Sequence, residues 1–300
     1  MNFRTIALLA MAVTVGCPFQ QEENGDAAAM AALATLSAPS SSLNSAVVSF
    51  EARDFNDTVF SCSGTFAVSS TVSLQPLDLR FYISDVRLVK DDGTTVPVIM
   101  TADGKWQSRG AALLDFENKS GTCTGGTTTT DTNTSIHFQY TPGSYAGIQF
   151  VLGLTDDLNR IQNTAESPFN VGGMYWSWTS GYKFARFEYR HENNTNNTLF
   201  HLGSQSCMGV SNPVSCAQPF RKTVRLTKSG FAPAGARIVL RLDELLTGFN
   251  TALAVNKSCM PAAADADCQP MLNNLKITTS AAGIGAGIDT GEATSVFELR

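Results

Sequence analysis

The chain has 300 residues, 43% hydrophobic and 16% charged, and its 21 Lys and Arg against 26 Asp and Glu give a net charge of −5. Charge is low against the ~25% usual in globular proteins. Ser, Thr, Asn and Gly take its place, which argues against a helical bundle because Ser, Thr and Asn compete for backbone hydrogen bonds. No basic stripe is present to neutralise phosphates, so nucleic-acid binding is excluded.

The N-terminus has the pattern of an export signal. An apolar run at residues 6–15 follows Arg4 and stops at Gly16 and Cys17, and it is too short for a membrane-spanning helix. Residues 13–17 resemble a bacterial lipobox, so we expect residues 1–16 to be a signal peptide and Cys17 to carry lipid. An ordinary secreted protein cut further along is the alternative. We interpret residues 17–45 as a polar and Ala-rich tether.

Strand patterns dominate the rest of the chain. Apolar residues alternate with others over 79–83, and the phase slips by one at Asp85, which predicts a β-bulge. Clean alternation recurs at 148–154, 185–189 and 238–242. Only residues 243–246 and parts of 156–166 have a helical pattern. Because no linker interrupts residues 46–300, we predict one all-β domain, an antiparallel β-sandwich or open barrel with long loops.

Cysteine spacing predicts a disulfide-stapled fold. With Cys17 assigned to lipid, six remain: Cys62, Cys123, Cys207, Cys216, Cys259 and Cys268. The sequence alone does not choose among their many pairings. Two closely spaced pairs favour local loops and would leave Cys62 to pair with Cys123. Export to an oxidising compartment supports disulfides, whereas the rival hypothesis of a thiolate metal site lacks any C-x-x-C spacing.

Catalytic signatures such as a nucleophile elbow, a zinc-protease motif or a nucleotide-binding loop are absent from the sequence, so we expect no enzymatic activity. Only three histidines occur. His137 falls on the polar side of an alternating stretch and His191 ends another, so both are expected at the surface. His201 precedes Leu202, Gly203 and Ser204 shortly before Cys207, and it is the strongest functional candidate.

The densest aromatic stretch lies at residues 173–184. Trp176 and Trp178 are two apart, so they share a face if the segment is a strand, and Met174 lies beside them. This composition is typical of a stacking platform for a sugar or of the wall of a soft-metal site. Packing of the sandwich core is the alternative interpretation.

Several segments together resemble the MbnP family, the exported "metallo-mystery pair" proteins with a four-cysteine motif. The resemblance covers roughly residues 46–275 in order, and it rests on residues 79–88, 105–107, 113–117, 148–153, 174–184, 201–204 and Cys207. It implies a copper-binding protein of the bacterial periplasm or outer membrane, attached to the membrane only through lipid. It also implies a partner resembling the di-haem cytochrome c peroxidases, which oxidises a tryptophan to kynurenine for binding Cu(I).

Carried over by residue, the resemblance implies His201 as the metal ligand and Trp176 or Trp178 as the modified side chain. Trp106 matches a family tryptophan to which we assign a structural role. The residues that match the four-cysteine motif are expected in disulfides: Cys207, Cys216, Cys259 and Cys268. Relatives often have Asn-His where this chain has Asn159 and Arg160. If that histidine is a ligand in relatives, copper binding here would be weaker, would use His191 or Met174 instead, or would be absent.

A second hypothesis belongs to another class of function. The chain would then be a cell-surface lipoprotein whose Trp176 and Trp178 form a platform for a glycan or peptide. Titration with copper and with a panel of glycans separates the two hypotheses.

Overall fold

A computed structural model describes residues 42–126, 129–161, 166–177, 180–191, 195–208, 215–260, 266–279 and 287–300. These residues belong to one compact unit, Ser41–Arg300. The predicted signal peptide, Cys17, most of the tether and Trp178 lie outside the described residues. No helix within the ranges given above is both long and apolar enough to cross a membrane.

The smaller of the two main sheets has five strands in the order β19-β17-β1-β8-β5. Its strands are β1 (Asn44–Arg53), β5 (Ile99–Met100), β8 (Ser135–Tyr140), β17 (Arg237–Arg241) and β19 (Phe297–Leu299). β1 pairs with β8 in antiparallel fashion and with β17 in parallel. An antiparallel sheet was predicted, whereas the sheet around β1 is mixed.

The larger sheet has ten strands, six of which form the path β16-β9-β3-β12-β13-β18. These six are β3 (Ser73–Val89), β9 (Gly147–Leu152), β12 (Ala185–His191), β13 (Asn197–Leu202), β16 (Lys222–Thr227) and β18 (Lys257–Cys259). The short strands β2 (Phe66–Ala67), β4 (Thr95–Pro97) and β7 (Ala111–Asp115) pair with β3, and β6 (Gln107–Ser108) pairs with β7. β13 and β18 are parallel, and the other pairs of this sheet are antiparallel.

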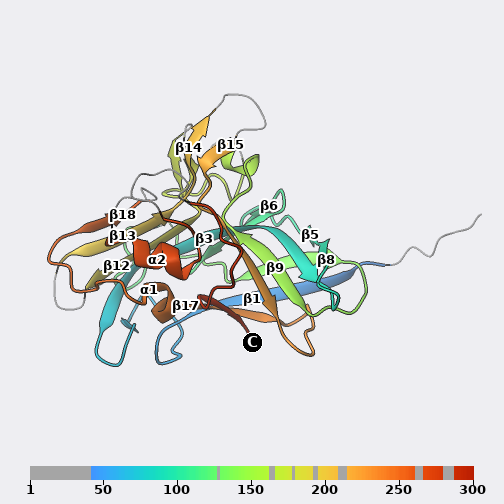
Figure 1. The fold of residues 1–300 in the computed structure, drawn as a ribbon, viewed down its shortest axis with the longest axis horizontal. Coiled ribbons are helices and arrows are strands. Elements are labelled where there is room, and N and C mark those ends of the chain that lie inside the picture. The colour runs from blue at the N-terminus through green and yellow to red at the C-terminus, as the bar shows by residue number, and fades with distance from the viewer. Residues whose placement is uncertain are drawn as a thin grey trace, which may run out of the picture. The chain divides into compact units, whose positions relative to one another are not determined.

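The two sheets face each other as layers of a sandwich and stay open, so the barrel alternative is not observed. Figure 1 shows β1 and β17 in one layer and β3, β9, β12 and β13 in the other. Phe50 of β1 lies 5.8 Å from Phe150 of β9 and 6.3 Å from Phe81 of β3, measured between ring centroids. Burial of alternate apolar side chains between the layers is what the period-two pattern predicts.

The predicted bulge in the long strand β3 is confirmed. The pairing of β3 with β9 shifts between Ser84 and Arg87, and Asp85 is exposed with a φ of 46°. One extra residue is accommodated there, so Val86 and Leu88 return to buried positions.

Short elements and disulfides complete the fold. Two small hairpins pair β10 (Tyr175–Ser177) with β11 (Gly181–Tyr182) and β14 (Gln205–Met208) with β15 (Ser215–Gln218). The helices are η1 (Leu158–Arg160), α1 (Leu242–Leu246) and α2 (Gln269–Asn274). The first two lie in the predicted helical regions, whereas α2 was not predicted. The three disulfides are Cys62–Cys123, Cys207–Cys216 and Cys259–Cys268.

Candidate metal site

A row of polar side chains crosses four strands of the larger sheet on the face turned away from the sandwich core. The strand register places His201 of β13 opposite Arg186 of β12, Arg186 opposite Arg80 of β3, and Arg80 opposite Asp115 of β7. Directly paired residues share one face of a sheet. Because Phe187 and its neighbours fill the core face, these charged residues gather on the other one.

Buried hydrogen bonds connect this row. His201 Nε2 lies 2.6 Å from Glu188 Oε1, and Arg186 Nε donates to the same oxygen at 2.5 Å. Arg186 also pairs with Asp78 at 3.1 Å, and Arg80 donates two hydrogen bonds to Asp78 at 2.8 and 2.6 Å. The Asp78 and Arg80 side chains are fully buried. The charges of Glu188, Arg186, Asp78 and Arg80 are therefore each paired.

The pKa values follow from burial and from these partners. Burial raises the pKa of Glu188, but hydrogen bonds from His201 and Arg186 outweigh it and bring the pKa to about 2. Burial lowers the pKa of His201 and outweighs the opposing effect of Glu188. At neutral pH the site therefore combines an ionised carboxylate with a neutral imidazole. His201 Nδ1 is buried and has no hydrogen-bond partner among the described residues.

Trp176 lies beside this histidine. The centroids of the Trp176 and His201 rings are 6.5 Å apart. Gly203 allows the indole to pack closely, because a Cβ at this position would come within 2.5 Å of the Trp176 ring and 2.6 Å of the Tyr182 carbonyl oxygen. Lys183 Nζ lies 5.9 Å from the indole centroid and donates to the Gly173 carbonyl at 2.7 Å. The fold thus holds one tryptophan next to the best ligand candidate.

The hairpin that carries Trp176 is held by aromatic packing and by Asn159. Asn159 Oδ1 accepts a hydrogen bond from the Tyr182 backbone N–H at 2.8 Å, and the Tyr175 and Tyr182 rings lie 5.0 Å apart. Arg160 follows Asn159 in η1 and is half-buried.

His191 does not join this cluster. Alternation along β12 places it with Phe187 and Tyr189 on the core face, and its Nε2 lies 3.3 Å from Thr198 Oγ1. The expectation of a surface position is wrong, because β12 continues through His191 in its pairing with Leu74 and only 3% of the residue is exposed. The register separates His191 from His201 by the length of β12.

The other candidates are also placed by the structure. Met174 is fully buried in the core cluster, and His137 is exposed as predicted. Trp106 is partly buried, with Lys105 Nζ 5.0 Å from its ring. Within the described ranges no group of three or more His, Cys, Asp or Glu side chains is arranged to hold a metal. His201 is therefore a lone imidazole ligand candidate on this face.

Sequence reasoning missed Glu188, Arg186 and Gly203. A signal for the first two was present, since Arg186 and Glu188 alternate with Ala185, Phe187 and Tyr189 and so mark a polar face of that strand. Which residues of neighbouring strands lie on that face, however, depends on strand order. Gly203 offered no local signal, because its role is set by an indole from another hairpin.

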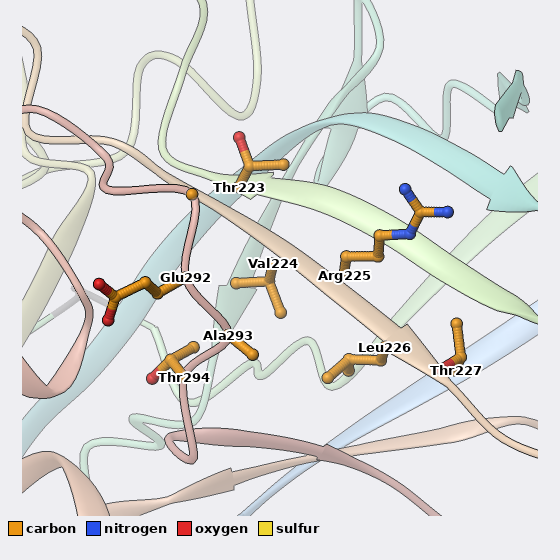
Figure 2. Close-up of a pocket in the computed structure, with 9 residues that line it drawn as sticks. Thr223, Val224, Arg225, Leu226, Thr227, Glu292, Ala293 and Thr294 are labelled. Carbon is orange, nitrogen blue, oxygen red and sulfur yellow. The ribbon is translucent and has the colours of Figure 1, made fainter. Parts of the chain in front are cut away.

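A groove beside β16 is separate from these residues. It runs between β16 and residues 291–294, and Figure 2 shows Glu292, Ala293 and Thr294 along its second wall. Lys222 Nζ, which is buried, donates to Asp289 at 2.5 Å and to the Glu292 carbonyl at 2.6 Å. None of the predicted site residues lines this groove.

The fold and the site define a disulfide-linked β-sandwich protein with a buried histidine–carboxylate pair facing an indole. Residues 44–261 match the model of the MbnP family, and the chain belongs to that family. Family membership indicates a copper-associated protein. The solved structure of MbnP from Methylosinus trichosporium is similar in fold, with 23% sequence identity and a TM-score of 0.71 over 86% of this chain and 98% of that one. No curated protein sequence matches.

Proposed function

We propose that this protein is an exported, non-enzymatic copper-binding protein in which His201 Nδ1 is a ligand of Cu(I) and oxidised Trp176 completes the site. The observation that carries the proposal is the buried, unpartnered Nδ1 of His201 beside the Trp176 ring. The protein would lie in the bacterial periplasm or at the outer membrane, and lipid on Cys17 would anchor it to a membrane.

The residues present fit a Cu(I) ion in their chemistry. Metal-binding histidines usually donate their other ring N–H to a carboxylate or carbonyl, and His201 has this arrangement with Glu188. A neutral imidazole is a suitable donor for copper. An indole is a poor ligand, whereas kynurenine carries an aromatic amine and a ketone. Oxidation of Trp176 would therefore add donors on a face where, among the described residues, His201 is the one histidine.

In this proposal the oxidation is carried out by a partner, because the sequence carries none of the standard catalytic signatures. In the proposal, a protein resembling the di-haem cytochrome c peroxidases uses two equivalents of peroxide to cleave the indole C2–C3 bond, with release of two waters. Hydrolysis then removes C2 as formate and leaves kynurenine. Partial exposure of Trp176 supports its access to such a partner.

Mass spectrometry and copper titration test the proposal. We expect protein produced with its cognate cytochrome to contain a Trp176 peptide that has gained one oxygen and lost one carbon. His201→Ala should abolish Cu(I) binding, while the exposed His137→Ala serves as the matched control and should bind like the wild type. Unmodified indoles throughout, together with unchanged binding by His201→Ala, would contradict the proposal. Binding to a glycan panel without any copper response would support the platform hypothesis instead.

A further inference from the structure

We infer that Glu188 is a positioning residue, which holds His201 in the tautomer protonated at Nε2 and so leaves Nδ1 as the only ring nitrogen able to bind a ligand. The tautomer stands on geometry alone. Its consequence for copper rests on the proposed function.

One carboxylate oxygen of Glu188 is shared by two partners. Glu188 Oε1 receives the Nε–H of Arg186 at 2.5 Å and lies 2.6 Å from His201 Nε2. An arginine can only donate, so this oxygen acts as an acceptor toward Arg186. The adjacent guanidinium charge also disfavours a proton on the carboxylate. His201 Nε2 must then be the donor, and in a neutral imidazole the other nitrogen carries the lone pair.

The position of Glu188 is set by the residues behind it. Arg186 lies between Glu188 and Asp78, with 3.1 Å from its Nε to the Asp78 carboxylate, and Arg80 holds Asp78 with two hydrogen bonds. The turn at Gly173 packs closely on these hydrogen-bonded side chains, since a Cβ there would come within 2.3 Å of Arg186 Nη1. The carboxylate therefore has little freedom to turn away from His201.

Nothing competes for the second ring nitrogen among the described residues. His201 Nδ1 is buried without a hydrogen-bond partner, and the neighbouring Trp176 ring is 6.5 Å away between centroids. A proton on Nδ1 would leave a buried donor unsatisfied, which costs free energy. The hydrogen bond at Nε2 and the lack of a partner at Nδ1 thus favour the same tautomer, with the proton on Nε2.

NMR of the copper-free, full-length protein tests the tautomer directly. Long-range ¹H–¹⁵N correlations of the histidine rings should show His201 protonated at Nε2 only. Glu188→Leu removes the acceptor and should give a mixture of tautomers or protonation at Nδ1. Glu188→Gln keeps an oxygen that can accept from both Arg186 and His201, so it should restore the wild-type pattern. His191, whose Nε2 contacts Thr198, serves as the internal control.

Protonation of His201 at Nδ1 in the wild type would overturn the inference, and so would an unchanged pattern in folded Glu188→Leu. If Glu188→Leu fails to fold, protonation at Nδ1 in the wild type or in Glu188→Gln would still overturn the inference. Cu(I) titration separates this inference from the proposed function. We expect about 10-fold or greater loss of affinity in Glu188→Leu and near-normal affinity in Glu188→Gln. The expected tautomers without copper binding in any variant would overturn only the copper proposal.

Discussion

Two acidic residues on the same polar face have opposite pKa shifts because their partners differ. Glu188 receives hydrogen bonds from His201 and Arg186, and its pKa falls to about 2. Burial raises the pKa of Asp115 to about 7, only partly offset by Arg80 and by the Glu117 N–H. Asp115 Oδ2 has no partner among the described residues. For Glu188 and Asp115, the balance between burial and hydrogen bonding decides which carboxyl stays ionised.

The raised pKa of Asp115 predicts a pH dependence of stability. Between its ordinary value of 3.8 and about 7, the folded protein retains a proton that the unfolded chain has lost. The contribution of Asp115 to the free energy of unfolding should therefore fall as pH rises, by up to about 1.4 kcal/mol per pH unit. Asp115→Asn should remove this loss, so its stability relative to the wild type should increase from pH 4 to pH 7 in urea denaturation.

Asp92 supplies a control of opposite sign. Its pKa is lowered mainly by hydrogen bonds from Thr94, so its contribution is present above the ordinary value and is lost on acidification. Asp92→Asn should accordingly lose stability relative to the wild type as pH rises toward 3.8, and the two profiles should run parallel above that pH. Parallel pH profiles for the wild type and Asp115→Asn would contradict the prediction for Asp115.

At the scale of elements, the long strand β3 pairs with several neighbours and carries a bulge at Asp85. β3 pairs with β12, β7 and β9 in turn, and the register with β9 shifts next to Asp85. The residue has a φ of 46°, a left-handed conformation that Asp tolerates better than β-branched residues do. The slip in the apolar pattern and the presence of Asp at this position thus have one cause, the left-handed backbone conformation at the bulge.

Substitution at Asp85 tests that requirement. Asp85→Val should lower the free energy of unfolding by about 1–2 kcal/mol, because Val disfavours positive φ. Asp85→Gly should cost less, since glycine adopts this conformation readily. The exposed contact with Arg87 contributes little to either value. Equal losses for both variants in urea denaturation would show that backbone conformation is not the cause.

At the scale of the whole molecule, aromatic side chains between the layers hold the sandwich together. Phe50, Phe81, Phe150 and Phe297 come from β1, β3, β9 and β19, and neighbouring rings meet at 5.5–6.3 Å. Such contacts join segments that are far apart in the chain. Loss of one ring should therefore weaken both sheets together rather than one hairpin.

Phe50→Ala should lower the free energy of unfolding by about 3–5 kcal/mol, since Phe50 is only 2% exposed and its removal leaves a cavity. Val47→Ala is the matched control on the other face of β1, where the side chain is 46% exposed, and it should change stability by no more than about 0.5 kcal/mol. Denaturant unfolding measures both. A similar small loss in the two variants would contradict the role assigned to the aromatic core.

The sequence by itself determined the β class, the phase slip at Asp85, the short helix near residues 243–246 and the exposure of His137. Each depends on local alternation or propensity, which a single segment expresses. The helix α2 (Gln269–Asn274) was not predicted. Its proline in the first turn was the available signal.

Only the tertiary structure decided how the candidate site is composed. The burial of His191, the shared oxygen of Glu188 and the packing of Trp176 on Gly203 all depend on which strands are neighbours and in what register. That register arises from contacts between segments more than a hundred residues apart, from Asp78 to His201, and local sequence does not encode it. The residue types that bind a metal can be recognised in the sequence, whereas which of them lie close together depends on the folded sheet.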